Sequence, residues 1–144
     1  MRRPIPMIAA GLAIALLAGC EPKAASDMPS EGRTALPQSV DVVISTESLP
    51  LLEAQIDGVI EAIEGCLSIR VHGDSAVPAY VLVLPPGSHR TETGVDISPG
   101  WSINLGESVA IAGGEAPVDG VAGYSLPTSC SAMPAFLVNE HAIG

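Results

Sequence analysis

The sequence predicts a small all-β domain of about five to seven strands, a sandwich or a barrel, that carries one disulfide. Three observations lead to this fold class. Short runs rich in Val, Ile and Leu recur at intervals of roughly 8–12 residues, and clusters of Gly, Pro and Asp separate them. Aromatic residues make up 3% of the chain, so aliphatic side chains must fill the core. Two cysteines, Cys66 and Cys130, lie within the region of these runs.

Residues 1–19 have the composition of a secretory signal peptide. Arg2 and Arg3 provide a basic start, and residues 7–18 (MIAAGLAIALLA) form an uncharged apolar stretch. Its twelve residues are too few for a helix to cross a bilayer, which takes about 20. The stretch therefore fits the apolar core of a signal peptide.

Residues 17–20 (LAGC) end this stretch on Cys20. A large apolar residue, two small residues and a cysteine resemble the lipobox of bacterial lipoproteins. The resemblance implies cleavage before Cys20 and a diacylglyceryl group on its sulfur. Each buried methylene of an acyl chain contributes about 0.8 kcal/mol, so two chains hold a protein firmly. We therefore expect a cell-envelope protein that is anchored to its membrane through Cys20.

The resemblance also bears on which membrane is involved. Glu21 follows Cys20 where enteric-type sorting rules associate Asp with inner-membrane retention. The outer membrane is therefore mildly preferred, with the outer face of the plasma membrane as the alternative.

Residues 20–46 predict a lipidated cysteine followed by a flexible linker. The stretch 21–39 is rich in Pro, Ala, Ser and charged residues and has no periodicity,. Residues 40–45 (VDVVIS) are β-prone, and two interpretations stay open: an edge strand or an apolar part of the linker. The barrel domain is expected over residues 47–144.

The predicted mature chain is strongly acidic. Without residues 1–19, four Lys and Arg face sixteen Asp and Glu, a net charge of −12. Nucleic acids and anionic lipid surfaces are bound through clusters of Lys and Arg. The sequence therefore argues against a nucleic-acid partner, while basic partners and divalent cations stay compatible with it. A soluble, mutually repelling surface is the plainest consequence.

Cys66 and Cys130 predict a disulfide. Export places them in an oxidising compartment, where the two cysteines that carry no lipid are expected to pair. A metal site or a catalytic thiol would need further ligands at the right spacing. His72, His89 and His141 do not supply that spacing, so no metal or cofactor is expected. Closing so long a loop stabilises a fold by about 4 kcal/mol in the chain-entropy account.

Residues 50–63 leave helix and strand open. Apolar residues recur there at helical spacing: Leu52, Ile56, Val59, Ile60 and Ile63,. Gly58 weakens such a helix. The alternative is a β-hairpin in which residues 58–63 pair with residues 66–71 across Glu64-Gly65, where glycine supplies a positive φ.

Further runs rich in β-branched residues predict strands at residues 66–71, 80–84, 101–105, 109–112 and 135–139. Turn signals separate them: His72-Gly73-Asp74, Pro85-Pro86-Gly87, Ser98-Pro99-Gly100 and Gly113-Gly114,. Pro85 must end the run at 80–84 because proline cannot continue a central strand.

Four features occur in order along residues 55–138: Gly65-Cys66-Leu67, an apolar run that ends in Pro85-Pro86-Gly87, the segment 106–114 (GESVAIAGG), and Cys130 followed by Phe136-Leu137-Val138. In this order they resemble a group of small secreted or lipid-anchored bacterial domains of uncharacterised function. The resemblance implies an OB-like barrel and favours the hairpin over the helix. It implies no catalytic residues.

Candidate binding residues are His89, Arg90 and Trp101. His89 and Arg90 lie near Glu92 and Asp96, on a stretch expected to be a loop. A polar binding site and a solvated hairpin tip both fit this cluster, and the second is the more common. Trp101 fits either a stacking surface or the largest filler of an aromatic-poor core.

Common catalytic motifs (GxSxG, the P-loop, GxGxxG, HExxH) are missing from the sequence,. The sequence therefore predicts a non-catalytic binding or assembly module at the cell envelope, with an envelope protein or cell-wall component as its unknown partner. One alternative is a tethered structural or inhibitory accessory protein. The other is a small hydrolase, which would require His89, Asp96 and a Ser or Thr within hydrogen-bond reach.

Overall fold

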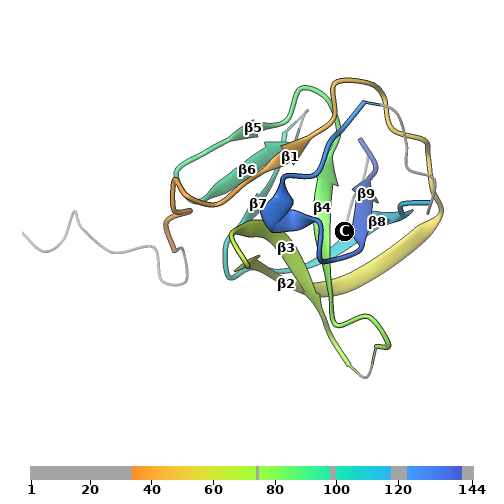
Figure 1. Ribbon diagram of the computed structural model, residues 1–144, viewed down its shortest axis with the longest axis horizontal. Helices are drawn as coiled ribbons and strands as arrows, with labels where there is room; N and C mark the ends of the chain where they lie inside the picture. The colour runs from red at the N-terminus through yellow and green to blue at the C-terminus, as the bar shows by residue number, and fades with distance from the viewer. Residues whose placement is uncertain (1–33, 74, 98–99, 118–122, 141–144) are drawn as a thin grey trace, which may run out of the picture.

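The computed structural model describes residues 34–73, 75–97, 100–117 and 123–140 (Figure 1). Almost all of its regular structure is β. The strands are β1 (Val43–Ile44), β2 (Ala54–Ile63), β3 (Cys66–Val71), β4 (Ala79–Leu84), β5 (His89–Arg90), β6 (Gly94–Ile97), β7 (Trp101–Asn104), β8 (Ser108–Glu115) and β9 (Ala135–Val138). One 3₁₀ turn, η2 (Thr128–Cys130), precedes β9. The predicted all-β fold class is confirmed.

Five strands close into a barrel. β2 pairs antiparallel with both β3 and β8, β3 pairs with β4, and β8 pairs with β9. The circle closes because β4 also pairs with β9, in parallel. This is a small Greek-key barrel of the OB type, as the resemblance implies,.

The β2–β3 hairpin decides between helix and strand for residues 54–63. Glu64 and Gly65 have φ values of 51° and 83°, the two positive values that a type I′ turn requires. Strand register then pairs Ile63 with Cys66 and Gly58 with Val71. The hairpin alternative is confirmed over this stretch, and the helix is wrong.

Aliphatic side chains fill the barrel, as the scarcity of aromatic residues requires. The fully buried members include Ile60, Leu67, Ile69, Leu82 and Ile111. Phe136 of β9 is the large aromatic residue among them, and Tyr80 meets its ring edge-on with centroids 5.8 Å apart.

A three-stranded sheet, β5-β6-β7, packs on the barrel. Its buried side chains Val95, Ile97 and Ile103 belong to the same apolar cluster as the barrel interior. β5 and β6 were not among the predicted strands. The expected loop before Trp101 is therefore partly a sheet, and its residues have fixed cross-strand neighbours.

A second apolar layer covers part of the outside of the barrel wall. Val81 and Val83 of β4 and Leu137 of β9 point away from the barrel interior. They are nevertheless fully buried, because two segments cover them. One segment brings Val43 and Leu49 from the N-terminal side. The other is the connection between β8 and β9, whose apolar members are Tyr124, Leu126, Cys130 and Met133.

The predicted disulfide is confirmed. Cys66 at the start of β3 is bonded to Cys130 in η2, with the two Cα atoms 5.7 Å apart. Both residues are fully buried. The bond therefore fastens the β8–β9 connection to the barrel wall.

The folded part begins before residue 47. Leu36 and Val40 are buried in the cluster that fills the barrel, and β1 pairs in parallel with β4, Val43 opposite Val83. The edge-strand interpretation of residues 40–45 is therefore correct, and a linker that extends to residue 46 is too long. The apolar residues of this segment pack against barrel strands that are distant in sequence, so the local sequence pattern does not predict their burial.

Gly113 and Gly114 lie inside β8 and do not form the predicted turn. A Cβ atom on Gly113 would overlap the carbonyl oxygen of Leu137 in the neighbouring strand, and one on Gly114 would lie 2.6 Å from the Leu52 side chain. Glycine is needed at these positions because other parts of the chain approach β8 closely.

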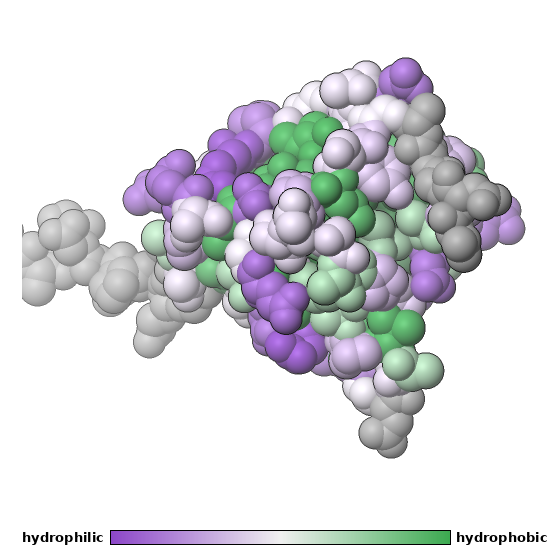
Figure 2. Space-filling view, viewed as in Figure 1, coloured by the Kyte–Doolittle hydropathy of each residue, from purple (hydrophilic) through white to green (hydrophobic). Residues whose placement is uncertain are grey.

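The predicted signal peptide, the LAGC motif and residues 21–33 lie outside the described residues. Within the described part, no helix is long and apolar enough to cross a membrane. Figure 2 shows that hydrophilic and hydrophobic residues are interspersed over the face drawn, with the hydrophobic ones in small areas.

Candidate functional site

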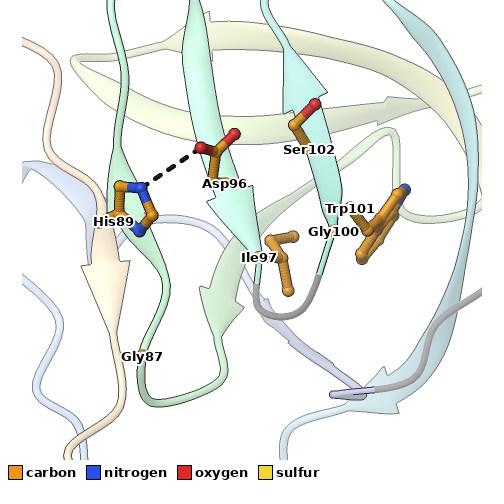
Figure 3. A pocket seen from close by; sticks show the side chains of 7 residues that line it. All are labelled: Gly87, His89, Asp96, Ile97, Gly100, Trp101 and Ser102. Atoms are coloured by element: carbon orange, nitrogen blue, oxygen red, sulfur yellow. Dashed lines mark ion pairs between the residues drawn. The ribbon is translucent and has the colours of Figure 1, made fainter.

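A cleft lies at the end of the three-stranded sheet where β6 and β7 meet (Figure 3). Its lining consists of Gly87, His89, Asp96, Ile97, Gly100, Trp101 and Ser102, and its volume is about 360 Å³. Small-molecule sites span about 300–1,000 Å³, so this cleft is at the small end. Gly87 and Gly100 have positive φ values of 88° and 78°, which turn the chain sharply at its border.

Strand register brings three polar side chains into one row across the sheet. His89 of β5 lies opposite Asp96 of β6, and Asp96 lies opposite Ser102 of β7. Residues directly opposite each other share a face, so the three side chains are neighbours. Figure 3 shows the His89 ring turned toward the Asp96 carboxylate.

The His89–Asp96 contact is open to solvent. Its Nε2 to Oδ2 distance is 3.3 Å, and the two side chains are 68% and 48% exposed. Pairs this exposed contribute at most about 1 kcal/mol to stability. The pair is therefore free to exchange partners when a ligand arrives.

Trp101 borders the cleft and also packs on the core. Its cross-strand partner is Ile97, which is fully buried, so the indole starts from the inner side of the sheet. It is half-buried against the barrel cluster, and Figure 3 places its ring across β7 from His89 and Asp96. One portion of the ring thus packs on the edge of the core and another lines the cleft.

Arg90 is separated from the cleft. Neighbouring residues on a strand point to opposite faces, and Arg90 turns away from His89 toward the N-terminal segment. Its Nη1 donates to the Val40 carbonyl at 2.6 Å, and its Nη2 donates to the carbonyls of Leu36, at 3.2 Å, and Pro37. Arg90 is thus a structural clamp, and it is not among the residues that line the cleft.

The side chains of the cleft do not form a nucleophile–base pair. A Ser–His–Asp group needs the serine hydroxyl beside the imidazole. Ser102 instead lies beside Asp96, with β6 between it and His89. In the described segments, no group of three or more His, Cys, Asp or Glu is placed to hold a metal ion.

The face that OB barrels commonly use for ligands is covered here. OB folds bind oligonucleotides and oligosaccharides on their second and third strands, which are β3 and β4 in this barrel. Of their outward residues, Ser68, Val81 and Val83 are fully buried, and Arg70 at the end of β3 stays exposed in its ion pair with Glu61. The cleft on the small sheet is therefore the better candidate.

A second, smaller hollow of about 150 Å³ lies near the last described residues. It is lined by Ser48, Leu49, Leu51, Asn139 and Glu140. The Asn139 side chain holds this region by donating to the Leu52 carbonyl at 2.7 Å and accepting from the Leu52 amide at 3.2 Å. Leu51 is 78% exposed, and the described residues bring no charged pair or aromatic ring to the lining.

Ser102 was not singled out from the sequence. Its position beside Asp96 depends on the pairing of β6 with β7, and no local signal for the register exists in the run WSINL. The proximity of His89 and Asp96, in contrast, was visible as a local cluster along the chain.

Comparison with known proteins gives no relative. A scan against protein-family models, a search of curated proteins and a search of solved structures each found no match. The chemistry of this chain has to be inferred from its own residues.

Proposed function

We propose that this chain is a lipid-anchored protein of the cell envelope whose barrel is a non-catalytic binding module. The observation that carries the binding role is the open cleft of about 360 Å³ with a row of polar side chains and one partly exposed indole. The LAGC motif at residues 17–20, after an uncharged apolar stretch, supports the anchor. Cys20 is the residue that would carry the lipid.

The tether in this proposal is short. Fifteen residues separate Cys20 from Leu36, which is buried against the barrel. A flexible chain of this length has a root-mean-square span of about 20 Å. The cleft would therefore work close to the membrane surface, against a partner that is itself in the envelope.

A site-specific photo-crosslinker tests this function in intact cells. Ser102 is the position for the probe because it is exposed and lines the cleft. Gln55, exposed on β2 and outside the lining, is the matched control position. We expect a discrete adduct from Ser102, identified by mass spectrometry, that Gln55 does not give and that decreases strongly in a Cys20→Ser background. Equal labelling from both positions would argue against a binding role for the cleft.

A further inference from the structure

We infer that the cleft binds a cationic group on an apolar stem, the ammonium or guanidinium group of a Lys or Arg side chain in a basic peptide. This inference rests on the proposed binding function and specifies its ligand. It follows from the charges that face the cleft, from the apolar surface beside them and from the position of His89.

The charge at the cleft is negative. Asp96 supplies a carboxylate, and the described residues of the lining include neither Lys nor Arg. Elsewhere in the described part of the chain, the Arg70 Nε donates to Glu61 at 2.8 Å, and Arg90 donates to backbone carbonyls. An anionic ligand would meet Asp96 without a neighbouring guanidinium to offset it, whereas a cation meets a partner.

The whole surface reinforces this preference. Eleven of the sixteen Asp and Glu residues lie in the described segments, against two of the six Lys and Arg. An excess of one sign raises the local concentration of ligands of the other sign. A basic peptide is therefore drawn toward the domain before it reaches the cleft.

The cleft also offers a place for the stem of a long basic side chain. Lys and Arg lay their methylene groups along apolar surface while their charged ends reach a polar group. The partly exposed Trp101 ring supplies the apolar part of the lining, since Ile97 beneath it is fully buried. Asp96 and Ser102 supply the polar part. The Asp96 carboxylate and the Ser102 hydroxyl both accept hydrogen bonds from an ammonium or guanidinium group.

His89 competes with such a ligand. Its Nε2 lies 3.3 Å from Asp96 Oδ2, so a cation that approaches the carboxylate must displace the imidazole. Removal of His89 should therefore strengthen the binding of a cation. A neutral ligand such as a sugar would instead lose a hydrogen-bonding partner.

The chain provides its own reporter for this test. Trp101 is its single tryptophan and borders the cleft, so intrinsic fluorescence responds to occupancy. The mature chain, purified from membranes in a non-ionic detergent, is titrated with Nα-acetyl-lysine methylamide. The neutral probe is the same compound with its side-chain amine acetylated.

We expect a saturable change with the cationic probe alone, with a dissociation constant of about 1 mM. Asp96→Asn should weaken binding by about fivefold or more, and high salt should weaken it as well. His89→Ala should tighten it. Glu61→Gln, which removes the same charge on β2 away from the cleft, should leave it unchanged. Thermal unfolding of each variant checks that these exposed substitutions preserve the fold.

Three results would overturn the inference. Equal responses to both probes, or unchanged affinity in Asp96→Asn, would mean a cleft that binds without regard to charge, which leaves the proposed function intact. If neither probe changes the Trp101 fluorescence, a basic side chain is not the ligand of the cleft. The proposed function would then depend on the Ser102 adduct alone.

Discussion

Arg90 connects two parts of the chain that lie about fifty residues apart. Its guanidinium donates to the carbonyls of Leu36, Pro37 and Val40, and its Nε is buried without a partner of its own. Hydrogen bonds from a charged donor contribute about 1.5–3 kcal/mol each when the acceptors would otherwise be buried unpaired. Arg90 therefore determines where the N-terminal segment leaves the barrel.

Two of these hydrogen bonds are part-buried and one is exposed, so water replaces part of what Arg90 supplies. Arg90→Ala should therefore lower the free energy of unfolding by about 2–3 kcal/mol in total and should open residues 36–40. Urea unfolding gives the first quantity, and amide hydrogen exchange at residues 36–40 gives the second. Arg70→Ala is the control, since its ion pair with Glu61 is exposed and should contribute less than about 1 kcal/mol. Similar losses in the two variants would contradict the clamp.

Two tyrosines link stability to alkaline pH. Burial raises the pKa of Tyr80 above its ordinary value of 10.0, and the Glu115 carboxylate raises it further. Burial raises the pKa of Tyr124 in the same way. Because these pKa values are higher in the folded state, the neutral phenols favour folding below pH 10, and this contribution is lost as pH rises beyond it.

Tyr80→Phe should therefore reduce the fall in stability between about pH 9.5 and 11. Phenylalanine keeps the edge-on contact with Phe136, so the packing is matched. Short urea titrations at each pH, with the disulfide checked afterwards, provide the measurement. A pH profile identical to that of the unmodified chain would show that Tyr80 does not carry the effect.

At the scale of elements, local sequence predicts strands well where the pattern and the turn agree. The runs at 66–71 and 80–84 were recognised because β-branched residues end at Gly73 and at Pro85. The first barrel strand stayed ambiguous for a physical reason. Ile56 and Ile60 are four residues apart, and that spacing shares a face in a helix and in a strand alike.

The elements that were missed depend on contacts distant in sequence. β5 has two residues and exists because β6 lies beside it. The Gly113-Gly114 pair predicts a turn. In the structure, the absence of side chains there allows β9 and Leu52 to approach β8 closely. Part of the candidate site could be predicted, because His89 and Asp96 lie close together along the chain. Ser102 lies beside Asp96 only because β6 pairs with β7 in this register. Arg90 follows His89 in sequence but points to the opposite face of the strand.

The Cys66–Cys130 bond fastens η2 and the β8–β9 connection over β4 and β9. Replacing both cysteines by alanine should cost about 2–5 kcal/mol, with partial exposure of Val81 and Val83. Urea unfolding and hydrogen exchange on β4 are the measurements. A loss below about 1 kcal/mol would mean that the apolar contacts hold the cover without the disulfide.

At the scale of the whole molecule, three layers determine what stays open. The barrel is filled from inside, the small sheet packs on its core, and the outer cover buries the wall formed by β4 and β9. The cleft stays open at the end of the small sheet, with His89 on the outer face of that sheet. Residues 36–40 dock on the opposite face through Arg90.

The central claim of this account is the proposed lipid anchor at Cys20, and the intact mass of the mature protein purified from membranes tests it directly. We expect a chain that starts at Cys20 and carries the added mass of a diacylglyceryl group on its sulfur. A chain that still begins at Met1, or one with a free thiol at Cys20, would contradict it.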